Sequence, residues 1–370
     1  MNNFNFCVPT LFGLEGLASK ELSRLGLENV KADNGRVFFS GSLSDMVLAN
    51  LWLRTGERVL LVMGSFPATT FTELFEGVKS LPWESIIPKN GAFPVKGHSL
   101  NSKLFSIPDC QSIVKKAVVE RLKSKYSTSW FEETGSKYQI QFSIMKDIAT
   151  LYIDTTGPGL HKRGYRAISG AAPLRETLAA ALVQLSGYRG REFFCDPFCG
   201  SGTILIEAAM IAENRAPGLL RRFAAESWDI SPKKDWHSPR ESAKEKTFSR
   251  DFELWGGDLD EDVLSLAKAN AKKAGVDKYI TFEKADATWF KPRHKAGICV
   301  TNPPYGERML ELREAERIYK GFGLASKHLP DFKNYIITSH PEFEHFYGKN
   351  ATKRRKLYNG MIKCELFMYF

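Results

Sequence analysis

Apolar side chains in the second half of the chain alternate between short continuous runs and repeats at helical spacing. The runs predict buried strands at residues 193–196, 254–258, 279–282, 298–301 and 335–338. The repeats predict helices at residues 173–185, 203–213, 263–274 and 318–329. This alternation is typical of a mostly parallel α/β sheet, and Asn359-Gly360 between two β-rich runs predicts a closing antiparallel hairpin.

The first half mixes short strands with helices, which indicates an α+β region of two small units. Strands are predicted at residues 4–8, 36–39, 59–63, 138–144 and 149–154, and helices around residues 14–25 and 109–122. We therefore place units at residues 1–65 and 66–155, a linker at 156–170 and a third unit at 171–370. Residues 226–251 lack clear periodicity and are expected to form a long insertion between the first two strands of the parallel sheet.

Composition narrows the class of protein. Hydrophobic residues make up 43% and charged residues 25%, and no apolar run reaches the roughly 18 residues that a membrane span needs. The N-terminus has no basic start followed by a long apolar segment, so we expect no secretory signal, no membrane and a cytoplasmic location. The six cysteines form no CxxC pair, so reduced core thiols are expected and no metal site.

The net charge of +10 favours a polyanionic partner such as nucleic acid, although a solubilising surface charge would look the same. The segment His161-Lys162-Arg163-Gly164-Tyr165-Arg166 mixes cations with an aromatic ring and reads as too polar for a core. We therefore expect contacts with RNA from Lys162, Arg163, Tyr165 and Arg166.

A glycine-rich turn follows the first strand of the third unit and is expected to bind a nucleotide-like cofactor. Its cofactor-binding residues are expected to be Asp196, Pro197, Gly200, Gly202 and Thr203. It is not a phosphate loop, because no lysine follows the second glycine. An ordinary strand–helix turn is the alternative.

Two further acids end the next strands. Asp258 is expected to accept hydrogen bonds from ribose hydroxyls, and Asp286 from an adenine amine. The alternatives are a helix cap, for which Asp260 fits better than Asp258, and a turn aspartate at position 286.

The sequence Asn302-Pro303-Pro304-Tyr305 follows the strand at residues 298–301 and suits a nucleobase amine. The Asn302 amide oxygen and the Pro303 carbonyl can accept from that amine and restore its lone pair, while Pro303 and Pro304 hold the backbone rigid. Tyr305 offers an aromatic face to a flipped base. An Asn-Pro turn is the alternative. With the glycine-rich turn, this set points to methyl transfer from S-adenosylmethionine, which needs no metal.

These motifs together resemble the THUMP-associated methyltransferases, RNA guanine-N2 enzymes often labelled adenine-specific DNA methylases. The residues that carry the resemblance are Leu160 to Arg166, Ala172 to Ala180, Asp196 to Thr203, Gly257 to Asp260 and Asn302 to Arg308. The resemblance implies a ferredoxin-like unit at 1–65, an RNA-binding THUMP domain at 66–155, and a Rossmann-like class I methyltransferase domain at 171–370. It also implies S-adenosylmethionine as cofactor and places Pro173, Leu174 and Arg175 beside it.

The same resemblance makes structured RNA the expected partner, rRNA ahead of tRNA, and implies no obligate protein partner. Within the family, the bacterial large-subunit rRNA guanine-N2 enzymes are the most similar. An adenine-N6 DNA methyltransferase is the second hypothesis, because adenine also presents an exocyclic amine. A non-catalytic RNA-binding assembly factor is the third. The expected THUMP unit favours structured RNA over DNA.

Overall fold

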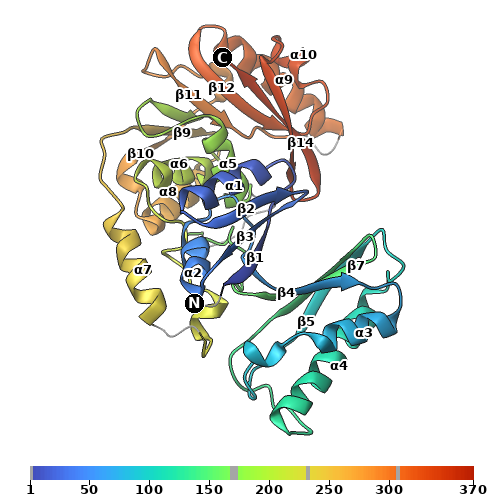
Figure 1. Cartoon of the computed structure of the whole chain (residues 1–370). Helices are drawn as coiled ribbons and strands as arrows, with labels where there is room; N and C mark the ends of the chain where they lie inside the picture. Colours follow the sequence, from blue (N-terminus) through green and yellow to red (C-terminus); the bar gives the residue numbers. More distant parts are fainter. Residues whose placement is uncertain (1–2, 167–173, 231–233, 306–308) are drawn as a thin grey trace.

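The computed structural model describes the chain except for residues 1–2, 167–173, 231–233 and 306–308. The described part contains two seven-stranded sheets, one in each half of the chain. Figure 1 shows the C-terminal sheet and the first N-terminal unit packed together, with the second N-terminal unit projecting from them. The α+β and parallel α/β halves are thus both present, in the predicted order.

The N-terminal sheet has the strand order β2-β3-β1-β4-β7-β6-β5 and runs through both small units. The first unit consists of β1 (Phe4–Pro9), α1 (Glu15–Arg24), β2 (Glu28–Asp33), β3 (Arg36–Gly41) and α2 (Leu43–Trp52). The second consists of α3 (Phe71–Ser80), β5 (Val95–Leu100), α4 (Ile107–Tyr126), β6 (Ile140–Met145) and β7 (Ile148–Asp154). β4 (Leu60–Pro67) belongs to both, since it pairs with β1 and with β7. The boundary drawn at residue 65 therefore falls inside a strand that fixes one unit to the other.

The C-terminal sheet has the order β10-β9-β8-β11-β12-β14-β13. Its parallel strands are β8 (Phe194–Asp196), β9 (Leu254–Asp258), β10 (Ile280–Lys284), β11 (Ala296–Thr301) and β12 (Asp331–Thr338). The hairpin of β13 (Lys353–Asn359) and β14 (Ile362–Tyr369) closes it, with β14 antiparallel to β12. The predicted mostly parallel sheet with an antiparallel hairpin is confirmed.

Helices cover both faces of this sheet. One hydrophobic cluster joins it to α5 (Glu176–Leu185), α6 (Thr203–Ala212) and α8 (Glu261–Ala274), and another joins it to α9 (Met309–Ser326) and α10 (Phe343–Tyr347). The strand order reverses between β8 and β11, where the chain switches from building one side of the sheet to building the other. Ligands of such sheets bind at the carboxyl ends of the strands beside this switch point.

The region expected to be an aperiodic insertion is more ordered than its sequence indicates. It contains α7 (Lys234–Glu245), and its aromatic rings join the hydrophobic core of the N-terminal half. The Trp228 ring stacks on Tyr138 with centroids 4.9 Å apart, and its Nε1 donates to the Lys137 carbonyl at 3.0 Å. The partners lie in a different unit, so no local periodicity could signal them. The insertion thus packs the C-terminal half against the second N-terminal unit.

The Arg163 side chain forms a buried ion pair and also hydrogen-bonds to the N-terminal half. The Arg163 and Tyr165 side chains are only 1% and 0% exposed, so the expectation that they lie on the surface and contact RNA is wrong. Arg163 Nε lies 3.3 Å from Glu207 Oε1 on α6, and Arg163 Nη2 donates to the Arg54 carbonyl, just after α2, at 2.6 Å. The Tyr165 hydroxyl donates to the same carboxylate oxygen at 3.2 Å.

We expect Glu207→Gln to lower the free energy of unfolding by about 3–5 kcal/mol, because it leaves the Arg163 guanidinium buried without its counter-charge. Urea unfolding followed by tryptophan fluorescence would measure this. The matched control is Glu261→Gln, which removes an exposed ion pair with Lys284 and should change stability little. Equal effects of the two substitutions would contradict a central role for the buried pair.

Candidate active site

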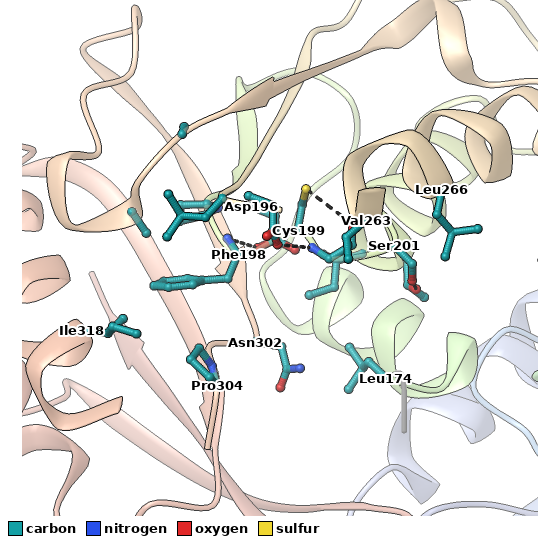
Figure 2. Close-up of a pocket in the computed structure, with 18 of the residues that line it drawn as sticks. Leu174, Asp196, Phe198, Cys199, Ser201, Val263, Leu266, Asn302, Pro304 and Ile318 are labelled. Atoms are coloured by element: carbon teal, nitrogen blue, oxygen red, sulfur yellow. Dashed lines mark hydrogen bonds between the residues drawn. The ribbon is translucent and has the colours of Figure 1, made fainter. Parts of the chain in front are cut away.

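A cavity of about 520 Å³ lies at the carboxyl ends of four neighbouring strands. Asp196 ends β8, Asp258 ends β9, Asp286 follows β10 and Asn302 follows β11, and all four line this cavity. Figure 2 shows Asp196 and Phe198 on one side of it, Leu174 and Ser201 on another, and Asn302 between Pro304 and Leu174. The structure therefore brings together the acids and the asparagine that the sequence places at strand ends. The volume of the cavity suits a cofactor-sized ligand.

The glycine-rich turn forms one wall. Gly200 has a φ of +51°, and its N–H donates to Asp258 Oδ2 at 2.9 Å, so the turn and the second acid are tied together. Gly202 is the N-cap residue of α6 and has a φ of +80°, and a Cβ there would lie 3.0 Å from the Phe282 ring. Pro197, Gly200 and Thr203 line the cavity. Gly202 does not; it provides the positive φ of the turn and the close packing against Phe282.

Asp196 is 1% exposed, and its carboxyl group is a weaker acid than an ordinary aspartate. Burial raises its pKa to about 7, although hydrogen bonds from the Thr301 hydroxyl at 2.6 Å and the Phe198 N–H at 3.1 Å favour the ionised form. The nearby Asp258 carboxylate raises it further. A cationic ligand group beside Asp196 would relieve this cost, so the site is suited to an ammonium group.

The two outer acids are held in place by backbone N–H groups. Asp258 Oδ1 accepts from the Asp260 N–H at 3.1 Å, and Asp260 in turn caps α8 through the Asp262 and Val263 N–H groups. Asp260 is therefore the residue that caps the helix, and Asp258 faces the cavity. Asp286 lines the cavity and also accepts from the Thr288 N–H at 2.8 Å, so its turn role and its place in the site coexist.

The loop after β11 presents Asn302 and Pro304 to the cavity, while Pro303 is buried. The Pro304 carbonyl accepts from the Tyr319 hydroxyl of α9 at 2.6 Å, which anchors the loop. The Tyr305 hydroxyl donates to Asn302 Oδ1 at 2.5 Å, and its ring packs against the hydrophobic core instead of lining the cavity. Stacking on a base would require the ring to leave this position.

The family resemblance places three further residues, Pro173, Leu174 and Arg175, beside the cofactor. Leu174 lines the cavity. Arg175 does not, because its Nη1 pairs with Glu57 Oε2 at 3.2 Å in the neighbouring cavity, so its expected position beside the cofactor is corrected. Pro173 lies outside the described residues. The apolar wall was missed because only the fold gathers it; it consists of Phe198, Ile204, Leu259, Val263, Leu266 and Ile318.

A second, larger cavity of about 1110 Å³ adjoins the first and is basic. It lies between the second N-terminal unit, the segment before β4, the linker, the start of α5 and the segment between α6 and the insertion. Its cationic side chains come from all of these parts; they are Arg58, Lys96, Lys137, Lys162, Arg163, Arg166, Arg175, Arg221 and Arg222. Its acidic side chains are Asp154 and Glu176. We call this cavity the basic cleft.

Of the four residues expected to contact RNA, Lys162 is exposed in the basic cleft and Arg166 lines both cavities. Arg163 and Tyr165 are buried, as described above. The sequence did not indicate Arg58, Lys96, Lys137, Arg221 or Arg222, because these cations are isolated or paired within unrelated segments. Only the fold brings them to one surface.

Within the described ranges, no helix is long and apolar enough to cross a membrane. All six cysteines are free and buried. In the same part of the chain, no three His, Cys, Asp or Glu side chains are grouped in a way that could hold a metal ion.

Three family models match consecutive parts of the chain. They are the RlmL ferredoxin-like domain at residues 5–60, the THUMP domain at 68–154 and the RMKL-like methyltransferase domain at 163–367. A Bacillus subtilis protein named "Putative RNA methyltransferase YpsC" is 45% identical over 100% of this chain and 97% of its own length. A Psychromonas ingrahamii protein named "Ribosomal RNA large subunit methyltransferase K/L" is 34% identical over 99% of this chain, which spans only 50% of that relative.

Solved structures agree closely with this fold. A "predicted N6-adenine-specific DNA methylase" from Listeria monocytogenes has a TM-score of 0.95 at 45% identity and covers 100% of this chain and 97% of its own. The structure of "SMU.472, a putative methyltransferase complexed with SAH" has a TM-score of 0.94 at 38% identity and covers 100% of this chain and 98% of its own. The chain therefore belongs to the RMKL-like methyltransferase family, with ferredoxin-like and THUMP domains ahead of a methyltransferase domain that uses S-adenosylmethionine.

Proposed function

We propose that this protein methylates the exocyclic N2 amine of a guanine in structured RNA, with 23S rRNA as the substrate, in the cytoplasm. The observation that carries the proposal is the position of Asn302, on the wall of the acid-lined cavity and next to the basic cleft. The names of the 45% and 34% identical relatives support RNA, and large-subunit rRNA in particular.

The residues of the cavity fit the parts of the cofactor, which supplies an activated methyl group on a sulfonium. Asp196 would hold the ammonium group, since a cation offsets the cost of its buried charge. Asp258 would accept from the ribose hydroxyls, because each of its oxygens keeps acceptor capacity beyond the one backbone bond it makes. Asp286 would accept from the adenine amine at the far end.

Asn302 would prepare the target amine. The lone pair of an exocyclic amine is delocalised into the base, so the nitrogen is a poor nucleophile. Acceptance of its N–H bonds by the Asn302 amide oxygen and the Pro303 carbonyl localises that lone pair and orients it. The loop is suited to this task because its two prolines stiffen it and Tyr319 anchors Pro304. Tyr305 would position Asn302 through the hydrogen bond between its hydroxyl and the amide oxygen.

The basic cleft would bind the RNA backbone. Eight cationic side chains, apart from the buried Arg163, against two acidic ones attract phosphates, and release of their counterions favours binding. Arg166 forms part of the wall between the cleft and the cofactor cavity, so a nucleotide extruded from RNA in the cleft has a short path to Asn302.

Asn302→Ala should slow methyl transfer by about ten- to a hundredfold, because it removes a hydrogen bond to an amine that gains positive charge in the transition state. Nucleoside mass spectrometry of RNA treated with each variant would measure N2-methylguanosine. Tyr305→Phe should cause a smaller loss, since it keeps Asn302 but no longer orients it. S-adenosylhomocysteine affinity should remain near wild type in both. Full activity of Asn302→Ala would refute the mechanism, and N6-methyladenine in DNA as the only product would refute the substrate.

The affinity for S-adenosylhomocysteine should depend on pH through Asp196. Its pKa is about 7 without a bound cation, and the ligand's ammonium group stabilises the carboxylate, so binding below pH 7 releases a proton. Affinity should therefore rise as the pH increases towards 7, by up to about tenfold per pH unit at the acidic end, and level off above. Calorimetry would measure this. Asp196→Asn should bind weakly at every pH, and 5′-methylthioadenosine, which has no ammonium group, should show no such dependence in the wild type.

Arg222→Met and Lys137→Met should each weaken RNA binding and reduce its salt dependence. Each phosphate contact that is lost should lower the slope of log affinity against log salt by about one. Fluorescence anisotropy with an rRNA fragment, titrated at several salt concentrations, would measure both quantities. Lys268→Met is the matched control, because it removes an exposed charge on α8 outside the basic cleft. The same slope in all four proteins would contradict this placement of the RNA.

A further inference from the structure

Arg166 forms part of the wall between the two cavities and is held there tightly. Its side chain is 14% exposed. Its Nη2 donates to the Thr203 hydroxyl at 2.6 Å and to the Leu174 carbonyl at 3.3 Å, and both of these residues line the cofactor cavity. The guanidinium group is thus fixed at the first residue of α6, beside the glycine-rich turn.

The charges of the cofactor cavity are unbalanced without this residue. Its acidic side chains are Asp196, Asp258 and Asp286, and among the described residues that line it Arg166 is the single cation. The amino-acid end of the cofactor carries a carboxylate as well as an ammonium group. A carboxylate in a cavity with three acids requires a cationic partner.

The order of the strands places this partner at the correct end. The sheet order β10-β9-β8 puts Asp286, Asp258 and Asp196 in a row. If the adenine lies at Asp286 and the ribose at Asp258, the amino-acid end lies over β8 and the start of α6. Arg166, Thr203 and Leu174 line the cavity at this end.

We propose that Arg166 binds the α-carboxylate of the cofactor, while Asp196 binds the ammonium group on the same carbon. Arginine suits a carboxylate because its planar guanidinium can form two parallel hydrogen bonds. Glu176, with Oε1 at 3.6 Å from Arg166 Nε, partly balances the charge of the guanidinium. This role depends on the cofactor alone and not on which base is methylated, so it can hold even if guanine-N2 specificity is refuted.

A cycle of two ligands and two proteins tests the proposal by calorimetry. The ligands are S-adenosylhomocysteine and S-adenosyl-3-thiopropylamine, which keeps the ammonium group but has no carboxylate. Wild-type protein should prefer the first by about ten- to a hundredfold, the value of a charged hydrogen bond. Arg166→Met should remove this preference by weakening only the first ligand, and Arg166→Lys should restore part of it. Lys268→Met, a loss of one positive charge outside the cavity, should leave the preference intact.

Several outcomes would overturn the assignment. If Arg166→Met weakens both ligands equally, the residue shapes the cavity without contacting the carboxylate. If both affinities are unchanged and RNA affinity falls, Arg166 belongs to the basic cleft alone. If Arg166→Met does not fold, the wild-type comparison still decides, since equal affinity for the two ligands would exclude any partner for the carboxylate.

Discussion

The buried ion pair between Arg163 and Glu207 is the constraint on which the arrangement of the molecule depends. One guanidinium reaches the end of α2 in the first N-terminal unit, the linker and the middle of α6. Because α6 begins at the glycine-rich turn, this contact sets the distance between the cofactor cavity and the N-terminal half. A buried pair adds little net stability over an apolar contact, but breaking it is costly, so it favours one geometry over others. The Arg221 guanidinium reinforces this geometry by donating to the carbonyls of Thr156 and Gly159 in the linker.

The segment at residues 161–166 shows where sequence reasoning succeeds and where it fails. Its cations indicate a segment that lines the two cavities, but their positions differ. Lys162 is exposed, Arg163 is buried and Arg166 lies between the two cavities. These neighbours share composition and differ only in the partners that the fold supplies. Since Glu207 lies 44 residues from Arg163, no local pattern could separate the buried cation from the exposed one.

The parallel sheet and the strand-end acids were predictable because they depend on short-range signals. Apolar runs mark buried strands, and polar residues that follow them converge at one edge of the sheet. The basic cleft was not predictable, since its cations come from both halves of the chain and from the linker between them. The position of Tyr305 was also missed. Its ring lies against the core, and only the tertiary structure shows that its hydroxyl can orient Asn302.

The two adjoining cavities have opposite charge, and this difference can sort the parts of a nucleotide. Phosphates are attracted to the basic cleft and repelled by the three acids of the cofactor cavity. A neutral base meets no such barrier, and the apolar wall around Phe198 and Ile318 favours its entry. The backbone would therefore remain in the cleft while the base alone reaches Asn302. Discrimination between bases must then come from hydrogen bonds at the Asn302 loop, because the charge pattern treats all bases alike.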